Sequence, residues 1–231
     1  MAENIHDKGY KRILSDKSVF LHLLRRYINT SWLEHVDVND LQLIDKEFIP
    51  KDFQEREADI IYKINREHGK DCYVYILLEL QSKVDYTMPF RLLIYMTELM
   101  KRIFNDTDKR VRERKSFRLP PIIPIVLYNG EQPWTAIREF RHYFEDSQVF
   151  GDRLLDFTYS LVDINAQDES FLLDMNTLLE NVFLLDRSQD QQSLQQALKV
   201  TMRRIQKLNR TEQLELSEWI RDCLLYTSRC V

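Results

Sequence analysis

The sequence predicts an α/β fold, and two kinds of pattern carry this prediction. Two apolar runs, 73–78 and 122–128, have the length of buried strands and are continuous, as expected for a sheet that is covered on both faces. The segment 88–104, which lies between them, has apolar residues at helical spacing. The resulting order of elements, α-β-β-β-α-β followed by further helices, is typical of α/β folds.

The N-terminal part of the chain supplies the first helix and three strands. Ser15 is a suitable N-cap for the helix, and Pro50 ends the first strand. Side chains alternate between two faces in the second strand, and a short polar turn joins it to the third strand as a hairpin. The predicted bounds are 15–29 for the helix and 41–49, 56–65 and 73–81 for the strands.

The C-terminal part is mostly helical. Pro89 lies in the first turn of the helix at 88–104, where proline is tolerated, and Asn129-Gly130 marks a turn after a buried strand. The predicted bounds are 122–127 and 156–162 for strands and 169–185, 189–208 and 211–226 for helices. We divide the chain into a nuclease-like core at 5–185, a helical extension at 186–223, and a last segment at 224–231 that resembles a truncation or a cloning scar.

The composition fits one compact domain with an appended element and excludes several classes of protein. The chain has 231 residues, of which 44% are hydrophobic and 30% charged, with a net charge of −4. No apolar stretch could cross a bilayer and the polar N-terminus lacks a signal-peptide core, so we expect a cytoplasmic protein without membrane contact. Three cysteines, five unpaired histidines and four scattered glycines argue against a disulfide scaffold, a zinc enzyme and a nucleotide-binding loop.

Three polar residues at predicted strand ends form the sharpest constellation. Glu79 and Gln81 are two residues apart and share a face of the sheet, and hairpin geometry lets the carboxylate of Asp59 approach that of Glu79. Two converging carboxylates repel each other unless a cation lies between them, and Mg²⁺ prefers such hard oxygen ligands. A metal held there would activate water for attack on a phosphodiester. The structural alternative is that Glu79 marks the strand's exit into solvent and Asp59 pairs with an arginine.

These residues and their surroundings resemble a known family. The pattern Asp59 with Glu79-Leu80-Gln81 is similar to the Asp–hairpin–Glu-x-Lys signature of the PD-(D/E)xK nuclease superfamily. Longer segments resemble the recombination-promoting nuclease (Rpn) family, also labelled a "putative transposase" family: His6-Asp7-Lys8-Gly9-Tyr10-Lys11, 48–50, 55–62, 79–82, 88–96, and 124–130 followed by Trp134. The resemblance covers residues 5–185 and implies a restriction-endonuclease-like core, with a mixed sheet flanked by helices.

The resemblance implies a DNA endonuclease that depends on Mg²⁺ or Mn²⁺ and is linked to recombination. Asp59 and Glu79 would be metal ligands, with the backbone carbonyl of Leu80 as a third. Gln81 stands where the superfamily usually has lysine, and glutamine can orient the attacking water but supplies no charge. Lys63, on the same strand face as Asp59, is the candidate for supplying that charge.

Other side chains are candidates for the metal or the DNA, and each has a structural alternative. Asp7 either adds a carboxylate from the first helix or caps a helix start. Arg91 and Tyr95 share a helix face and either contact phosphate or brace the site. A basic run forms a phosphate-binding surface or a solvated loop, and it includes Lys101, Arg102, Arg110 and Arg112. By contrast, Lys199 and Arg203 fit the solvated face of an amphipathic helix.

Three functions compete on this evidence. The first is a metal-dependent endonuclease with DNA as partner, and it leaves a homo-oligomer open. The second is a weak or inactive DNA-binding or protein-interaction module on a nuclease fold, which the acidic net charge and Gln81 favour. The third, a transposase of the RNase H type, ranks last because the sequence offers no third acid in a suitable position after the helix at 88–104.

Overall fold

The structure, a computed structural model, describes residues 5–28, 30–44, 60–66, 72–188 and 190–224. In these ranges five strands form one sheet in the order β1-β2-β3-β4-β5. β2 runs antiparallel to β1 and β3, while β4 and β5 run parallel to β3, so the sheet is mixed. The strands span Leu41–Leu43 (β1), Ile60–Arg66 (β2), Cys72–Gln81 (β3), Ile122–Tyr128 (β4) and Ser160–Asp163 (β5). The predicted α/β class is confirmed.

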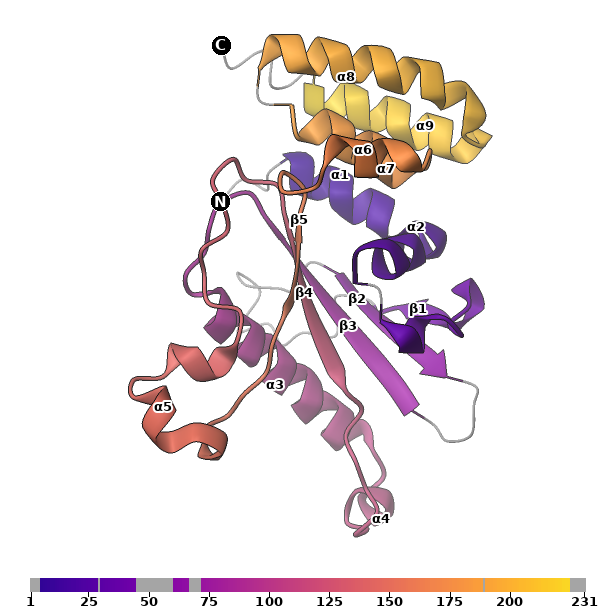
Figure 1. Ribbon diagram of the computed structural model, residues 1–231. Helices are drawn as coiled ribbons and strands as arrows, with labels where there is room; N and C mark the ends of the chain where they lie inside the picture. The colour runs from indigo at the N-terminus through magenta and orange to yellow at the C-terminus, as the bar shows by residue number, and fades with distance from the viewer. Residues whose placement is uncertain (1–4, 29, 45–59, 67–71, 189, 225–231) are drawn as a thin grey trace.

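Helices flank this sheet (Figure 1). One face packs against α3, and the other against α1, α2 and the helices of the C-terminal part. The α-helices span Ile5–Leu14 (α1), Lys17–Leu23 (α2), Met88–Asp106 (α3), Lys109–Arg112 (α4), Ser147–Phe150 (α5), Glu169–Asp174 (α6), Leu178–Asp186 (α7), Gln191–Arg204 (α8) and Arg210–Trp219 (α9). Shorter turns span Leu24–Ile28 (η1), Ser31–Leu33 (η2), Val38–Asp40 (η3), Phe140–Tyr143 (η6), Gly151–Arg153 (η7), Ile205–Lys207 (η8) and Ile220–Leu224 (η9).

The two faces of β2 explain why its side chains alternate. Ile60, Tyr62 and Ile64 belong to the large core beneath α1 and α2, whereas Ile61 belongs to the smaller core beneath α3. The Tyr62 ring stacks on Phe20 of α2 with 4.1 Å between ring centroids. Successive residues of a strand point to opposite faces, so one strand serves both cores and fixes the position of the helices on each side.

The N-terminal region differs from the single helix predicted at 15–29. The helix α1 comes first, and Asp16, not Ser15, is the N-cap of α2, because its carboxylate accepts the backbone N–H groups of Ser18 and Val19. The Ser15 hydroxyl instead donates to the carbonyl of Lys11, a local bond that a serine forms at the end of a helix. After Leu23 the chain continues as the π-helical turn η1.

Two predicted strands also have different bounds. β1 ends at Leu43, and the rest of the predicted strand at 41–49 falls mostly outside the described residues. β5 begins at Ser160 and not at 156. The residues just before it are engaged elsewhere, since Thr158 forms an isolated antiparallel bridge with Glu139.

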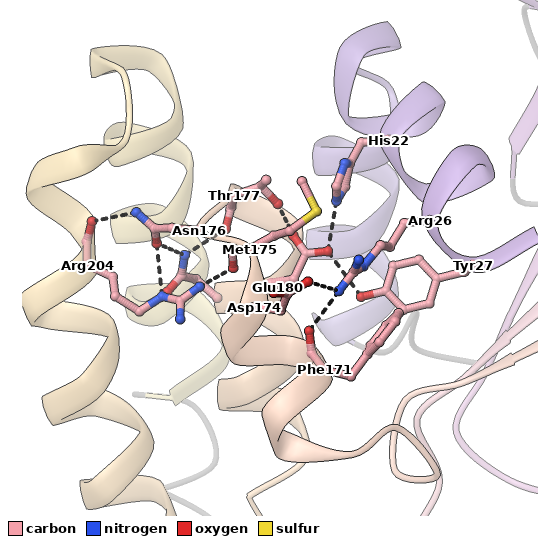
Figure 2. A network of polar contacts seen from close by, with 11 residues as sticks. His22, Arg26, Tyr27, Phe171, Asp174, Met175, Asn176, Thr177, Glu180 and Arg204 are labelled. Carbon is pink, nitrogen blue, oxygen red and sulfur yellow. Dashed lines mark hydrogen bonds and ion pairs between the residues drawn. The ribbon is translucent and has the colours of Figure 1, made fainter. Parts of the chain in front are cut away.

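The helix predicted at 169–185 is broken into α6 and α7 by an extended residue, Met175. The break is stabilised from α8, as Figure 2 shows. The Arg204 guanidinium donates to the carbonyls of Leu173 and Met175 and to the side chain of Asn176. Carbonyls at a helix end need hydrogen-bond donors from outside the helix, and Arg204, about thirty residues away in sequence, supplies them.

The last helices share the large core with the sheet. Leu216 and Trp219 of α9 are fully buried in the same cluster as Tyr10 of α1 and Leu80 of β3. The division of the chain at residue 185 stays a prediction. Within the ranges described, no helix combines the length and apolar character that crossing a bilayer requires.

Candidate functional site

The end of β3 carries a buried carboxylate. Glu79 is the Cα partner of Val126 in β4, and Gln81 is the partner of Tyr128. Val126 packs in the core beneath α3, so Glu79 and Gln81 lie on the face of the sheet that α3 covers. The Glu79 side chain is only 1% exposed. A carboxylate in such a place is costly unless a charge or hydrogen-bond donor pairs with it.

That partner comes from the first turn of α3. Met88 and Leu92 are fully buried against the sheet, and Arg91, which lies between them in sequence, reaches the strand end. Its Nη2 lies 3.0 Å from Oε2 of Glu79, and its Nη1 lies 2.7 Å from Oδ2 of Asp85. One guanidinium therefore bridges two carboxylates, which suits its forked geometry.

The electrostatics of this cluster favour the charged forms of Arg91 and Asp85. Burial lowers the pKa of Arg91, but the charge of Glu79 and the hydrogen bond to Asp85 outweigh it and raise that pKa overall. Burial also raises the pKa of Asp85, while hydrogen bonds from Thr87 and Arg91 lower it to a net value below the ordinary one. Arg91 and Asp85 are therefore both ionised at neutral pH.

Of the other predicted site residues, the structure brings Tyr95 to this cluster but not Lys63. The Tyr95 hydroxyl lies 3.4 Å from Nη2 of Arg91. Lys63 is the partner of Tyr75 in the β2–β3 ladder. Tyr75 precedes Glu79 by four residues, so Lys63 and Glu79 are separated by about 13 Å along the strand direction at the usual rise per residue. Arg91 thus provides the cation beside Glu79.

The other three predicted metal ligands lie in different parts of the chain, and one of them is outside the described residues. Asp59 lies outside the described residues. Asp7 is in the first turn of α1 and half-buried. Leu80 is the partner of Leu127 within the parallel ladder of β3 and β4. Their roles as ligands stay predictions.

The predicted basic surface lies at the opposite end of the sheet from Glu79. Arg91 is in the first turn of α3, but Lys101 and Arg102 are near its end, and Arg110 and Arg112 are in α4, just before β4 begins (Figure 1). Several of these side chains are used locally, since Arg102 pairs with Asp106 at 3.4 Å and Arg112 donates to the carbonyl of Phe104 at 3.0 Å. The structure therefore does not bring this basic surface and Glu79 together.

A cleft of about 890 Å³ opens beyond the C-terminal ends of β3 and β4, and we call it the strand-end cleft. Asp186, the last residue of α7, lines this cleft. The Asp186 side chain is only 2% exposed. The carboxylate lies 2.8 Å from Nδ1 of His6 and accepts from the Tyr10 hydroxyl at 2.6 Å and the Asn129 amide at 2.8 Å. Residues from α1, the segment after β4 and α7 thereby meet at one side chain.

No single motif in the sequence predicts this arrangement. Two signals pointed at parts of it, namely the segment from His6 to Lys11 and the Asn129-Gly130 turn. Asp186 stood in no motif, and its three partners are 57 to 180 residues away in sequence. A local pattern could not reveal that they converge.

A second buried carboxylate, Glu180, has a structural role (Figure 2). It lies 2.7 Å from Nε2 of His22, and it accepts hydrogen bonds from the hydroxyls of Tyr27 and Thr177. Burial raises the pKa of Glu180, but the His22 and Thr177 contacts outweigh it and lower that pKa overall. Its acceptors are used between α2, η1 and α7, so it ties helices together.

The donors at the end of β3 fit a hard divalent cation chemically. The carboxylate of Glu79 and the amide of Gln81 offer oxygen atoms of the kind that Mg²⁺ takes. A metal would share the Glu79 carboxylate with Arg91. No group of three or more His, Cys, Asp or Glu side chains among the described residues is arranged as a metal site, and Asp59 is not among them.

Comparison with known proteins places these features in a family. A family model described as "Putative transposase, YhgA-like" matches residues 4–215. Recombination-promoting nuclease RpnD of Escherichia coli O157:H7 is 26% identical over 164 residues, which is 70% of this chain and 59% of the relative. Recombination-promoting nuclease RpnC of Escherichia coli (strain K12) is 29% identical over 170 residues, which is 73% of this chain and 53% of the relative.

Another relative carries a different name. The "Inactive recombination-promoting nuclease-like protein RpnE" of Escherichia coli (strain K12) is 26% identical over 160 residues, which is 69% of this chain and 50% of the relative. The chain thus spans about half the length of these curated relatives. No solved structure matches it.

The family match runs from α1 into α9 and includes the β3 strand end, Arg91 and the strand-end cleft. Its extent exceeds any single motif in the sequence, and it agrees with the ordered segments that resembled the Rpn family. The chain therefore belongs to the YhgA-like "putative transposase" family, which includes the recombination-promoting nucleases that it matches.

Proposed function

We propose that this chain carries the catalytic centre of a metal-dependent DNA endonuclease with a PD-(D/E)xK core, linked to recombination or mobile elements. The observation that carries the proposal is the burial of Glu79 at the end of β3, in contact with Arg91 and two residues before Gln81. Buried charges in this kind of cluster are concentrated at functional sites. The nuclease names of RpnC and RpnD support the same activity.

The register of the sheet supports a role for Asp59 beside Glu79. Ile60 is the Cα partner of Leu78, and Ile61 is the partner of Leu77. Asp59 itself lies outside the described residues and directly precedes Ile60 in the sequence. We infer that the two carboxylates share one metal at the face of the sheet that α3 covers.

The proposed roles follow from the chemistry of each group. Asp59, Glu79 and the carbonyl of Leu80 would hold Mg²⁺ or Mn²⁺, with Asp7 as a further candidate ligand. Once bound, the metal would polarise the phosphodiester and lower the pKa of an attacking water. Gln81 orients that water through its amide.

Arg91 has a separate part in this scheme. It pairs with Glu79 and would supply the positive charge that lysine would provide at position 81. Arg91 therefore takes the part that the sequence analysis had assigned to Lys63.

The test is nicking of supercoiled plasmid by the full chain with Mg²⁺, Mn²⁺ or EDTA. We expect metal-dependent nicking that Asp59→Asn and Glu79→Gln each abolish, because both variants keep the side-chain shape but remove a ligand charge. Glu113→Gln is the matched control. Glu113 is exposed and directly follows α4, which lies near the C-terminal end of α3, whereas Arg91 and Glu79 meet at its N-terminal end. Equal nicking by the Glu79→Gln variant and the control would reject the site.

A second function, a DNA-binding or interaction module that does not cut, is favoured by two observations. Arg91 already neutralises part of the Glu79 charge, and RpnE is named inactive. Calorimetry with Mn²⁺ distinguishes the two. The nuclease predicts Mn²⁺ binding that depends on both Asp59 and Glu79, and the module predicts none.

A further inference from the structure

The strand-end cleft adjoins the proposed catalytic strand. Its volume of about 890 Å³ is near the upper end of the usual range for ligand sites. Lys83 lines it from the segment after β3, and Arg187 lines it from the end of α7. The backbone N–H of Asn129, another lining residue, donates to the carbonyl of Gln81 at 3.0 Å. A ligand in the cleft would therefore lie next to the end of β3.

The cleft is lined by as many cations as acids, and these groups differ in the contacts that they already make. Lys83 and Arg187 both line it, and neither is ion-paired with a carboxylate in the part of the chain that the structure describes. Two acids also line it. Asp186 directs its carboxylate inward to His6, Tyr10 and Asn129, and Glu131 is exposed. Lys83 and Arg187 can thus contact an incoming anion, with Glu131 as the opposing charge that lines the cleft.

Arg187 carries a more specific sign of an anionic ligand. Its Nη1 is buried and has no hydrogen-bond acceptor among the described residues. Its place at the C-cap of α7 explains why a cation is tolerated there. The helix end does not explain a buried donor without an acceptor, because such a donor costs free energy. Nη1 is closed to solvent as it stands, so an anion in the cleft would satisfy it once the Arg187 side chain turns toward the cleft, and guanidinium groups bind phosphate through paired hydrogen bonds.

We propose that the strand-end cleft binds the phosphodiester backbone of a nucleic-acid strand, with Arg187 and Lys83 as its phosphate contacts. The inference rests on the proposed function, since a nuclease centre at Glu79 requires the strand that it cuts to pass the end of β3. It also replaces the basic surface around α4, which lies at the other end of the sheet, as the main site of DNA contact.

The experiment measures binding of a fluorescently labelled DNA oligonucleotide to the full chain by anisotropy, in EDTA, over a series of salt concentrations. The double variant Lys83→Gln/Arg187→Gln should bind about tenfold more weakly and lose about one unit of the log–log salt slope for each cation removed. The matched control is Lys199→Gln/Arg203→Gln, which removes the same charges from the exposed face of α8 and should change neither quantity.

Several results would overturn the inference. One is unchanged affinity and slope in the double variant, with circular dichroism that confirms its fold. The single variant Lys83→Gln tests the inference even if substitution of Arg187 disturbs folding. Because Lys83 is exposed, its substitution should weaken DNA binding without affecting the fold. Another is inorganic phosphate binding that depends on Arg187 while DNA binding does not, which would assign the cleft to a free anion.

Failure of this inference can be told apart from failure of the proposed function. If Glu79→Gln abolishes nicking but the cleft variant binds DNA normally, the nuclease stands and the cleft assignment is wrong. If no metal supports nicking but DNA binding depends on Lys83 and Arg187, the cleft assignment stands and the proposed nuclease activity is wrong.

Discussion

Nη2 of Arg91 lies 3.0 Å from the carboxylate of Glu79, across the interface between α3 and the sheet. The Glu79 side chain is 1% exposed and that of Arg91 is 24% exposed, so the pair spans from the buried strand to the surface. The same guanidinium also binds Asp85, just before α3. The start of α3 is therefore held to the end of β3 by charge as well as by its apolar face.

Removing Arg91 should destabilise the fold, because it takes the guanidinium away from a buried carboxylate. We expect Arg91→Ala to lower the free energy of unfolding by about 3 kcal/mol, the low end for a broken buried pair, since Arg91 is partly exposed. In the Arg91→Ala/Glu79→Gln variant part of this loss should return, since the carboxylate charge is gone as well. Urea denaturation of Arg91→Ala, Glu79→Gln and the double variant measures the coupling, and strictly additive losses would contradict it.

The stability that Glu180 contributes should depend on pH. Its pKa in the folded protein lies below the ordinary value of 4.5, so its contribution is present above pH 4.5 and is lost as the pH falls through the folded pKa. At pH 7, Glu180→Gln should cost about 2 kcal/mol, as expected for charge-assisted hydrogen bonds. The difference in free energy of unfolding between the native protein and Glu180→Gln, measured by urea denaturation, should narrow below pH 4.5. A difference that stays constant down to pH 3 would contradict this account. The control, Glu113→Gln, should leave the free energy of unfolding unchanged across the same pH range.

Gly130 should resist substitution for a steric reason. A Cβ added there would lie 2.3 Å from the Tyr128 hydroxyl, and the Tyr128 ring is held against Trp134 with 5.0 Å between centroids. We expect Gly130→Ala to cost about 2 to 3 kcal/mol by thermal denaturation. The cost should fall in a Tyr128→Leu background, where the ring is absent.

Gly151 provides the contrasting case. Its φ is +51°, and a Cβ would meet nothing within 4 Å. With ψ at −125° the residue lies outside the left-handed α region, so Gly151→Ala should cost about 1 to 3 kcal/mol by thermal denaturation, from backbone strain alone. That cost should be the same with or without Tyr128→Leu, and a dependence on Tyr128 would show that the steric reasoning is wrong.

Trp219 tests whether the helices after residue 185 unfold with the sheet. The Trp219 side chain is fully buried in the large core, and its ring meets His6 of α1 edge-on at 5.8 Å. We expect Trp219→Ala to cost about 3 to 5 kcal/mol and to leave one cooperative transition in calorimetry. Leu214→Ala is the control, since Leu214 is 60% exposed and should shift stability by less than about 0.5 kcal/mol. A second, unshifted transition would instead support a separate helical extension.

The strands β2, β3 and β4 and the helix α3 were predictable within a few residues, because their patterns have periods of two or 3.6 residues over a single segment. The break between α6 and α7 was not predictable in this way. It depends on Arg204, which stabilises the open turn from α8. Capping contacts of this kind are tertiary, so a continuous helical pattern in the sequence could not reveal them.

The candidate site likewise has some features that follow from local sequence patterns and others that depend on tertiary contacts. Local order along the chain is enough to predict that Glu79 ends an apolar strand, that Gln81 shares its face and that the chain resembles a nuclease family. The packing of the folded chain is needed to show that Arg91 contacts Glu79, while Lys63 lies at another level of the sheet. It also shows that the basic residues of α4 lie at the far end of the sheet and that His6, Asn129 and Asp186 meet at one cleft. The physical reason is that such contacts depend on how distant segments pack, and packing is set by the whole core at once.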